Sequence, residues 1–108
     1  MKTIRLGLCK EGHEIPGVTR YIFEREIENP MNFEELYHKA FNFLEEILID
    51  SIRDNEEIQI EVYTSGLTSA LCAVINASSS LKIVIDIGHY DRNTNTYKLQ
   101  KMAFCGRM

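Results

Sequence analysis

A strand, a short helix and a second strand follow one another between residues 57 and 87, and this unit constrains the fold most. Residues 57–64 alternate apolar and polar side chains, as expected for a strand with one buried face. Residues 67–77 are rich in alanine, serine and cysteine and predict a short helix that lies close to a sheet. Residues 81–87 form a second apolar run. Such a crossover predicts that the two strands are parallel.

Three further strands extend this unit. Residues 3–9 are rich in β-branched and aliphatic side chains and predict the first strand. Residues 18–26 alternate and predict a second strand, which we expect to be the antiparallel partner of the first. The polar turn at residues 91–96 joins residues 81–87 to a last strand at 97–104, and its shortness predicts an antiparallel hairpin.

A long amphipathic helix is predicted from Asn32 to about residue 52, because large apolar residues recur there at helical spacing. Asn32 can cap its first turn, and Glu35 stands at the spacing of a capping box. Met31 and Leu36 are placed to form a hydrophobic staple across that cap. These signals fix the start of the helix.

The predicted fold class is therefore α/β (α+β): a two-layer sandwich of order ββαβαββ, with a mixed sheet and two helices on one face. The other sheet face is mixed in character and carries Tyr21, Phe23, Glu61 and Tyr63. With 108 residues, 44% of them hydrophobic, the chain is expected to form a single domain over residues 1–108 with one core.

Charge and cysteine content narrow the classes of function. A formal net charge of −4 argues against a general binder of duplex DNA. No run approaches the roughly 18 apolar residues of a membrane-spanning helix, so no membrane partner is expected. Cys9, Cys72 and Cys105 are widely spaced and odd in number, which indicates reduced thiols and a cytoplasmic protein.

The first candidate site is the turn between residues 57–64 and the short helix. A strand that turns into a helix presents backbone N–H groups and hydroxyls where proteins hold phosphate or carboxylate groups. The alternative is a plain helix cap, in which Ser65 or Thr68 caps the helix and Gly66 serves only the backbone angle. The candidate ligand-binding residues of this turn are Thr64, Ser65, Gly66, Leu67 and Thr68.

The second candidate site follows the next strand and starts at the same carboxyl edge of the sheet, where open α/β sheets tend to bind ligands. His89 could act as a general acid or base, and Asp91 could orient it. Arg92 could hold a phosphate. The alternative is an ordinary hairpin turn.

Two further features border this edge. His13 lies in the loop after the first strand, but Cys9 and His13 lack the paired cysteines of a zinc site, so no metal is predicted. Tyr63, Tyr90 and Tyr97 could stack on a nucleobase, although tyrosines are also common strand residues.

These segments resemble a known family, the small CRISPR-associated ring nucleases of ferredoxin-like fold. Residues 64–67 look like that family's ligand-binding turn, and residues 90–92 look like its Asp-Pro-Arg segment without the proline. The resemblance implies a homo-oligomer that binds cyclic oligoadenylate or RNA 3′ ends and uses a metal such as manganese. The chain also resembles small proteins of phages and mobile elements, which share its Gly-Leu-Thr helix start and its His-Tyr-Asp-Arg segment.

The differences between this chain and the family bear on whether the protein only binds the ligand or also cleaves it. The family places a histidine late in the second helix and another near the C-terminus, where this chain has residues 76–77 and 101–103 without histidine. We therefore expect a protein that sequesters a nucleotide-type signal as an anti-defence sponge, with no cofactor, in a bacterial or phage-infected cell. The alternatives are a manganese-assisted ring nuclease that uses His89 and Asp91, and a protein-interaction domain that uses the open sheet face.

Overall fold

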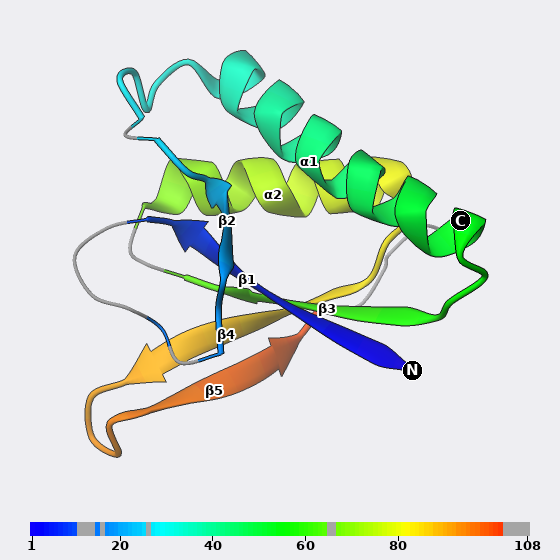
Figure 1. Ribbon diagram of the computed structural model, residues 1–108. Helices are drawn as coiled ribbons and strands as arrows, with labels where there is room; N and C mark the ends of the chain where they lie inside the picture. The colour runs from blue at the N-terminus through cyan, green and yellow to red at the C-terminus, as the bar shows by residue number, and fades with distance from the viewer. Residues whose placement is uncertain (11–14, 16, 26, 65–66, 103–108) are drawn as a thin grey trace.

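The computed structural model shows a two-layer α/β sandwich, with both helices on the same side of a five-stranded mixed sheet (Figure 1). It describes residues 1–108 except 11–14, 16, 26, 65–66 and 103–108. The elements in chain order are β1 (Lys2–Cys9), β2 (Arg20–Phe23), α1 (Phe33–Arg53), β3 (Ile58–Tyr63), α2 (Thr68–Leu81), β4 (Ile85–Asp91) and β5 (Thr96–Lys101). The predicted fold class and the order ββαβαββ are confirmed. Neither described helix combines the length and apolar character needed to cross a membrane.

The strands lie side by side in the order β2-β1-β3-β4-β5. The predicted parallel pairing of β3 with β4 and the antiparallel hairpin of β4 and β5 are confirmed. The antiparallel pairing predicted for β1 and β2 is wrong, because the two strands are parallel, with Leu6 opposite Arg20. Residues 10–19 connect them, and this connection is longer than a tight hairpin loop and allows the chain to return before β2 begins.

The serines at residues 78–80 do not end α2, which continues to Leu81 rather than stopping at residue 77. The Ser78 hydroxyl donates to the carbonyl of Ile75 at 2.8 Å, so this polar group is satisfied inside the helix. Lys82 ends the helix in the left-handed conformation, at φ 58°. The next strand therefore starts later than predicted, at Ile85.

The core lies between the sheet and the two helices. The alanines of α2 at positions 70, 73 and 77 are buried, so small side chains let this helix approach the sheet closely. The alternation predicted for β3 holds, since Ile60 and Val62 enter the core, and Leu6 and Leu8 of β1 alternate in the same way. The largest fully buried side chains are Leu6, Leu8, Leu36, Leu44, Ile60, Ile85, Ile87, Val62 and Val74.

The N-terminus of α1 has only one of the two hydrogen bonds of a capping box. The Asn32 side-chain oxygen accepts a hydrogen bond from the backbone N–H of Glu35 at 3.2 Å, as predicted. The reciprocal bond of a capping box is replaced, because the Asn32 N–H donates to Asn29 and the Glu35 carboxylate pairs with Lys39 at 3.3 Å. Met31 stays 69% exposed, so the predicted staple buries little of it.

Replacement of Asn32 by alanine should lower the free energy of unfolding by about 1 kcal/mol, because one N–H of the first turn loses its acceptor. Urea denaturation measures the change. Asn42→Ala is the matched control, since Asn42 is exposed on the same helix and alanine favours helix there. An equal loss of stability in both variants would contradict the capping role.

Candidate functional site

The sheet face opposite the helices is ordered in rows that run across the strands. The strand register places one residue of each strand in a single row: Tyr21, Gly7, Tyr63, Gly88 and Leu99. Large and small side chains therefore alternate along this row. We call this side of the sheet the open face.

The two glycines of the row create room for the two tyrosine rings. A Cβ atom added to Gly7 would lie 2.3 Å from ring atoms of Tyr21, and one added to Gly88 would lie 2.5 Å from a ring atom of Tyr63. Each ring therefore lies against the backbone of a glycine on the neighbouring strand. Both tyrosines are half-buried, so part of each side chain remains accessible to solvent.

Four of the chain's five tyrosines lie on the open face, and we call them together the tyrosine cluster (Tyr21, Tyr63, Tyr90 and Tyr97). The Tyr63 and Tyr97 rings meet edge to face, with centroids 5.2 Å apart, and the Tyr90 and Tyr97 rings lie 5.4 Å apart. Tyr90 is 48% exposed and its hydroxyl donates to Asn95 at 2.9 Å. The cluster thus offers partly exposed aromatic surface next to the hairpin.

A second row on the open face is charged. Arg5 lies opposite Glu61, and Glu61 lies opposite Asp86. Glu61 is only 6% exposed, and its Oε1 accepts hydrogen bonds from Arg5 Nε at 3.1 Å and from the Tyr63 hydroxyl at 2.8 Å. Asp86 is 5% exposed and accepts from the Gln59 amide at 2.9 Å. Both buried carboxylates are therefore hydrogen-bonded, as buried charges require.

Arg5 links the charged row to the tyrosine cluster. Its ion pair with Glu61 uses Nε, so within the described residues its two terminal nitrogens have no carboxylate partner. Contact with the Tyr63 hydroxyl, followed by the bond to Glu61, raises the pKa of Arg5. The guanidinium is thus held in place while donors remain for an anion, since this group suits phosphate and carboxylate oxygens.

Burial raises the pKa of two tyrosines in the cluster. For Tyr63 the largest cause is loss of solvent, followed by its hydrogen bond to Glu61. For Tyr97 the largest cause is again loss of solvent, followed by the charges of Tyr90 and Tyr21.

The predicted anion-binding turn at the start of α2 is only partly described. Ser65 and Gly66 lie outside the described residues. Thr64 donates both its backbone N–H (3.0 Å) and its hydroxyl (3.3 Å) to the carbonyl of Gly88, so these donors already have an acceptor. These bonds bring the ends of β3 and β4 together, as the shared sheet edge predicted.

The first residues of α2 show how this helix begins. Leu67 occupies the cap position without a side-chain capping bond, and Thr68 is the exposed first residue of the helix. The hydroxyl oxygen of Ser69 is buried and has no hydrogen-bond partner within the described part of the chain. Of the two capping residues that the cap alternative offers, Thr68 is wrong, because Leu67 occupies the cap position, and Ser65 lies outside the described residues.

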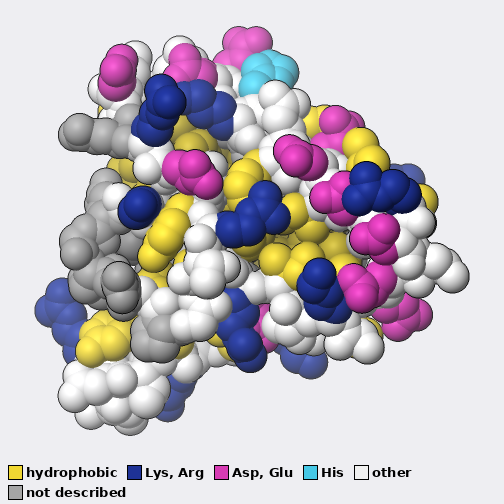
Figure 2. All heavy atoms as spheres, in the orientation of Figure 1, with side chains coloured by type: hydrophobic (Ala, Val, Ile, Leu, Met, Phe, Trp, Pro, Cys, Tyr) yellow, Lys and Arg dark blue, Asp and Glu magenta, His cyan; other side chains and the backbone are white. Residues whose placement is uncertain are grey.

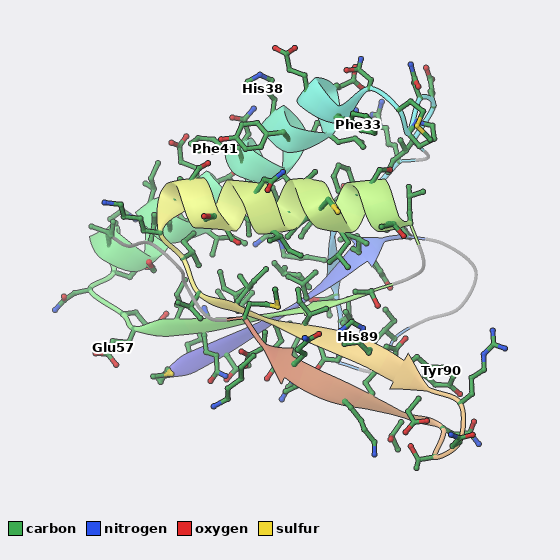
Figure 3. All side chains as sticks on the ribbon, turned by 180° about the vertical axis from the view of Figure 1, so that it is seen from behind. Phe33, His38, Phe41, Glu57, His89 and Tyr90 are labelled. Carbon is green, nitrogen blue, oxygen red and sulfur yellow. The ribbon has the colours of Figure 1, made fainter. Side chains whose placement is uncertain are left out.

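The residues predicted around His89 do not form one pocket. His89 Nε2 lies 2.8 Å from the Gln100 side-chain oxygen, and Asp91 pairs with Lys98 at 3.5 Å. Alternation along β4 places His89 and Asp91 on the opposite side of the sheet from Tyr90. His89 and Tyr90 are both near the hairpin end of β4 (Figure 3). Arg92 is exposed in the hairpin turn.

Two further predictions concern His13 and a possible metal site. His13 lies outside the described residues, so its predicted place beside the ligand has no structural counterpart here. Within the described ranges, no group of three histidine, cysteine, aspartate or glutamate side chains is arranged to hold a metal ion.

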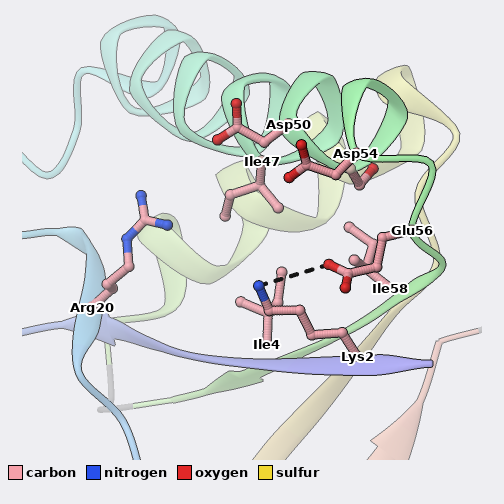
Figure 4. A pocket seen from close by; sticks show the side chains of 9 residues that line it. Lys2, Ile4, Arg20, Ile47, Asp50, Asp54, Glu56 and Ile58 are labelled. Atoms are coloured by element: carbon pink, nitrogen blue, oxygen red, sulfur yellow. Dashed lines mark ion pairs between the residues drawn. The ribbon is translucent and has the colours of Figure 1, made fainter.

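A small cavity lies on the helix side, between the end of α1 and the first half of β1 (Figure 4). Its volume is about 90 Å³, well below the roughly 300–1,000 Å³ of typical small-molecule pockets. Ile4, Ile47 and Ile58 line it, and Lys2 pairs with Glu56 across its rim at 3.7 Å. Figure 2 shows apolar side chains in this hollow, with basic and acidic side chains around it. The open face remains the better candidate for a ligand of nucleotide size.

Sequence reasoning placed Tyr21, Phe23, Glu61 and Tyr63 on one sheet face, and the register confirms this, although Phe23 is buried. It missed Arg5 as a site residue. The available signal was the alternation in β1, where Thr3, Arg5 and Gly7 interleave with apolar residues. The pairing of Arg5 with Glu61 depends on the register between β1 and β3, which periodicity does not give.

Comparisons with known proteins give no identification. Comparison with family models, with curated proteins and with solved structures returned no match to this chain. The arrangement of residues on the open face is therefore the basis for a functional proposal.

A double-mutant cycle tests the seat of Tyr63 on Gly88. Gly88→Ala alone should lower the free energy of unfolding by about 1–3 kcal/mol, because the new methyl group overlaps the Tyr63 ring. In a Tyr63→Ala background the same change should cost almost nothing, because the ring is gone. Urea denaturation of the four proteins measures the coupling. An equal cost in both backgrounds would show that the ring does not occupy this space.

The raised pKa of Tyr63 predicts a loss of stability at alkaline pH. A tyrosine whose pKa is higher in the folded than in the unfolded chain contributes stability below about pH 10. That contribution disappears as the pH rises through the pKa of the folded state. As the pH is raised above 9, the free energy of unfolding should therefore fall less for Tyr63→Phe than for the wild type. Parallel pH dependences in urea denaturation would refute this expectation.

Proposed function

We propose that this protein binds a nucleotide-derived anionic ligand on the open face and holds it without cleaving it. The observation that supports the proposal is the position of the Arg5 guanidinium, fixed by Glu61 beside the tyrosine cluster. Arg5 supplies donors for a phosphate, and the tyrosine rings supply stacking surface for a base. The binding residues predicted in the sequence that belong to this arrangement are Tyr63 and Tyr90.

The arrangement suits a ligand with both a charge and an aromatic group. Because the Nε of Arg5 is engaged by a nearly buried carboxylate, the guanidinium is oriented before the ligand arrives. A preorganised donor loses less conformational entropy on binding. Tyr90 is 48% exposed, so a base can reach its ring without a rearrangement of the core.

The resemblance to ring nucleases supplies the ligand class to test first, which is cyclic oligoadenylate. In this proposal the protein is a homo-oligomeric sponge that removes a defence signal in the cytoplasm of a bacterial or phage-infected cell. The turn at residues 64–68 remains part of the proposal as a second contact for phosphate. The proposal includes no cofactor.

Binding is favoured over catalysis by the contacts of the two predicted catalytic residues. His89 contacts Gln100 and Asp91 contacts Lys98, so these two side chains are engaged with β5 rather than with each other. They also lie on the other side of the sheet from Tyr90. A ligand on the open face would therefore be remote from them.

Titration calorimetry with cyclic tri- and tetra-adenylate and with adenosine monophosphate tests the proposal. Arg5→Lys keeps a cation opposite Glu61 but removes the guanidinium fork, so affinity should fall about ten-fold. Arg92→Lys, in the exposed hairpin turn, is the matched control. The sequence also predicts a phosphate contact for Arg92, and an effect confined to that variant would move the site to the hairpin.

Mass spectrometry of the recovered ligand separates holding from cutting. After incubation with and without manganese, intact cyclic ligand supports a sponge, whereas linear product supports a ring nuclease. If no nucleotide raises the melting temperature at high excess, both fail, because a ligand at 100 times its Kd adds about 2.7 kcal/mol. The open face would then be better explained as a protein-interaction surface. Light scattering of the same samples gives the oligomeric state.

A further inference from the structure

The open face presents two tyrosine rings that lie over separate glycines. Tyr21 extends from β2 over Gly7 of β1, and Tyr63 extends from β3 over Gly88 of β4. Only strand β3 separates β1 from β4. Neighbouring strands are about 4.8 Å apart, so the two glycines that seat these rings are about 10 Å apart across the sheet.

This spacing is too large for two bases stacked on each other. Bases in a stacked strand are about 3.4 Å apart along the helix axis. Two positions roughly 10 Å apart instead suit bases that are separated, each on its own ring. Proteins that recognise single strands stack separated bases on aromatic side chains in this way.

Arg5 lies where a phosphate that links two separated bases would be bound. It belongs to β1, the strand between those that carry Tyr21 and Tyr63. Its position is two residues before Gly7, and its bond to Glu61 on β3 draws the guanidinium toward the interval between the two rings. The terminal nitrogens of this group lack a carboxylate partner among the described residues and suit phosphate oxygens.

We infer that the ligand contains at least two unpaired nucleotides joined by a phosphodiester. One base stacks on Tyr21, the next stacks on Tyr63, and the phosphate between them binds Arg5. This inference rests on the proposed function and makes it more specific, since a mononucleotide fills only half of the arrangement.

Calorimetry with adenosine monophosphate and with 5′-phosphorylated di- and tri-adenylate tests the inference. Each stacked base contributes about 1–3 kcal/mol, so the dinucleotide should bind about ten-fold or more tightly than the mononucleotide. Adenylate paired with a complementary strand should bind more weakly than the free strand, because its bases are not available for stacking.

Tyr21→Leu should remove the advantage of the dinucleotide over the mononucleotide, because only one of the two stacking rings then remains. Tyr37→Leu is the matched control, since Tyr37 is the fifth tyrosine, lies on α1 and bonds to Ser80. Circular dichroism shows whether both variants keep the fold.

The outcomes separate this inference from the proposed function. If the mononucleotide binds the wild type as tightly as the dinucleotide, the two-base arrangement is refuted while nucleotide binding stands. If Tyr21→Leu and Tyr37→Leu have equal effects, Tyr21 does not contact a base. If none of these nucleotides binds, the proposed function itself fails.

Discussion

The register between β1 and β3 is the constraint on which the open face depends. Six pairs run from Lys2 opposite Ile58 to Gly7 opposite Tyr63. A slip of one residue would turn every side chain of β1 to the other face, which would bury Arg5 and expose Leu6. The apolar residues of β1 prevent this slip, because Leu6 and Leu8 are fully buried under the helices. Burial of the apolar side chains of β1 therefore also fixes which of its polar residues lie on the open face.

The open face combines features that stabilise the sheet with features that suit a ligand. Glycine weakens a strand, but a ring that covers the glycine backbone restores contacts and shields it from water. Gly7 and Gly88 are covered in this way by Tyr21 and Tyr63. Tyr21 and Tyr63 are only half-buried, so their stabilising role leaves part of each side chain accessible for binding.

Much of the fold could be predicted because the spacing of apolar residues along the sequence reflects which positions are buried. The alternation of β3, the helical spacing of α1 and the crossover through α2 gave the element order and the parallel pairing of β3 with β4. The direction of β2 could not be predicted, since it depends on the path of residues 10–19. The candidate site was predicted only in part, because Arg5 meets Glu61 through pairing between strands that are distant in the sequence.

The acidic composition of the chain shapes how an anion would be held. Arg5 and Glu61 form a pair with little net charge, so long-range attraction from this site is weak. The donors of the guanidinium still act at short range, where geometry matters more than net charge. Selectivity would then arise from the joint presence of a base and a phosphate. An inorganic anion would gain only the contact with Arg5, whereas a nucleotide would add stacking on the tyrosine cluster.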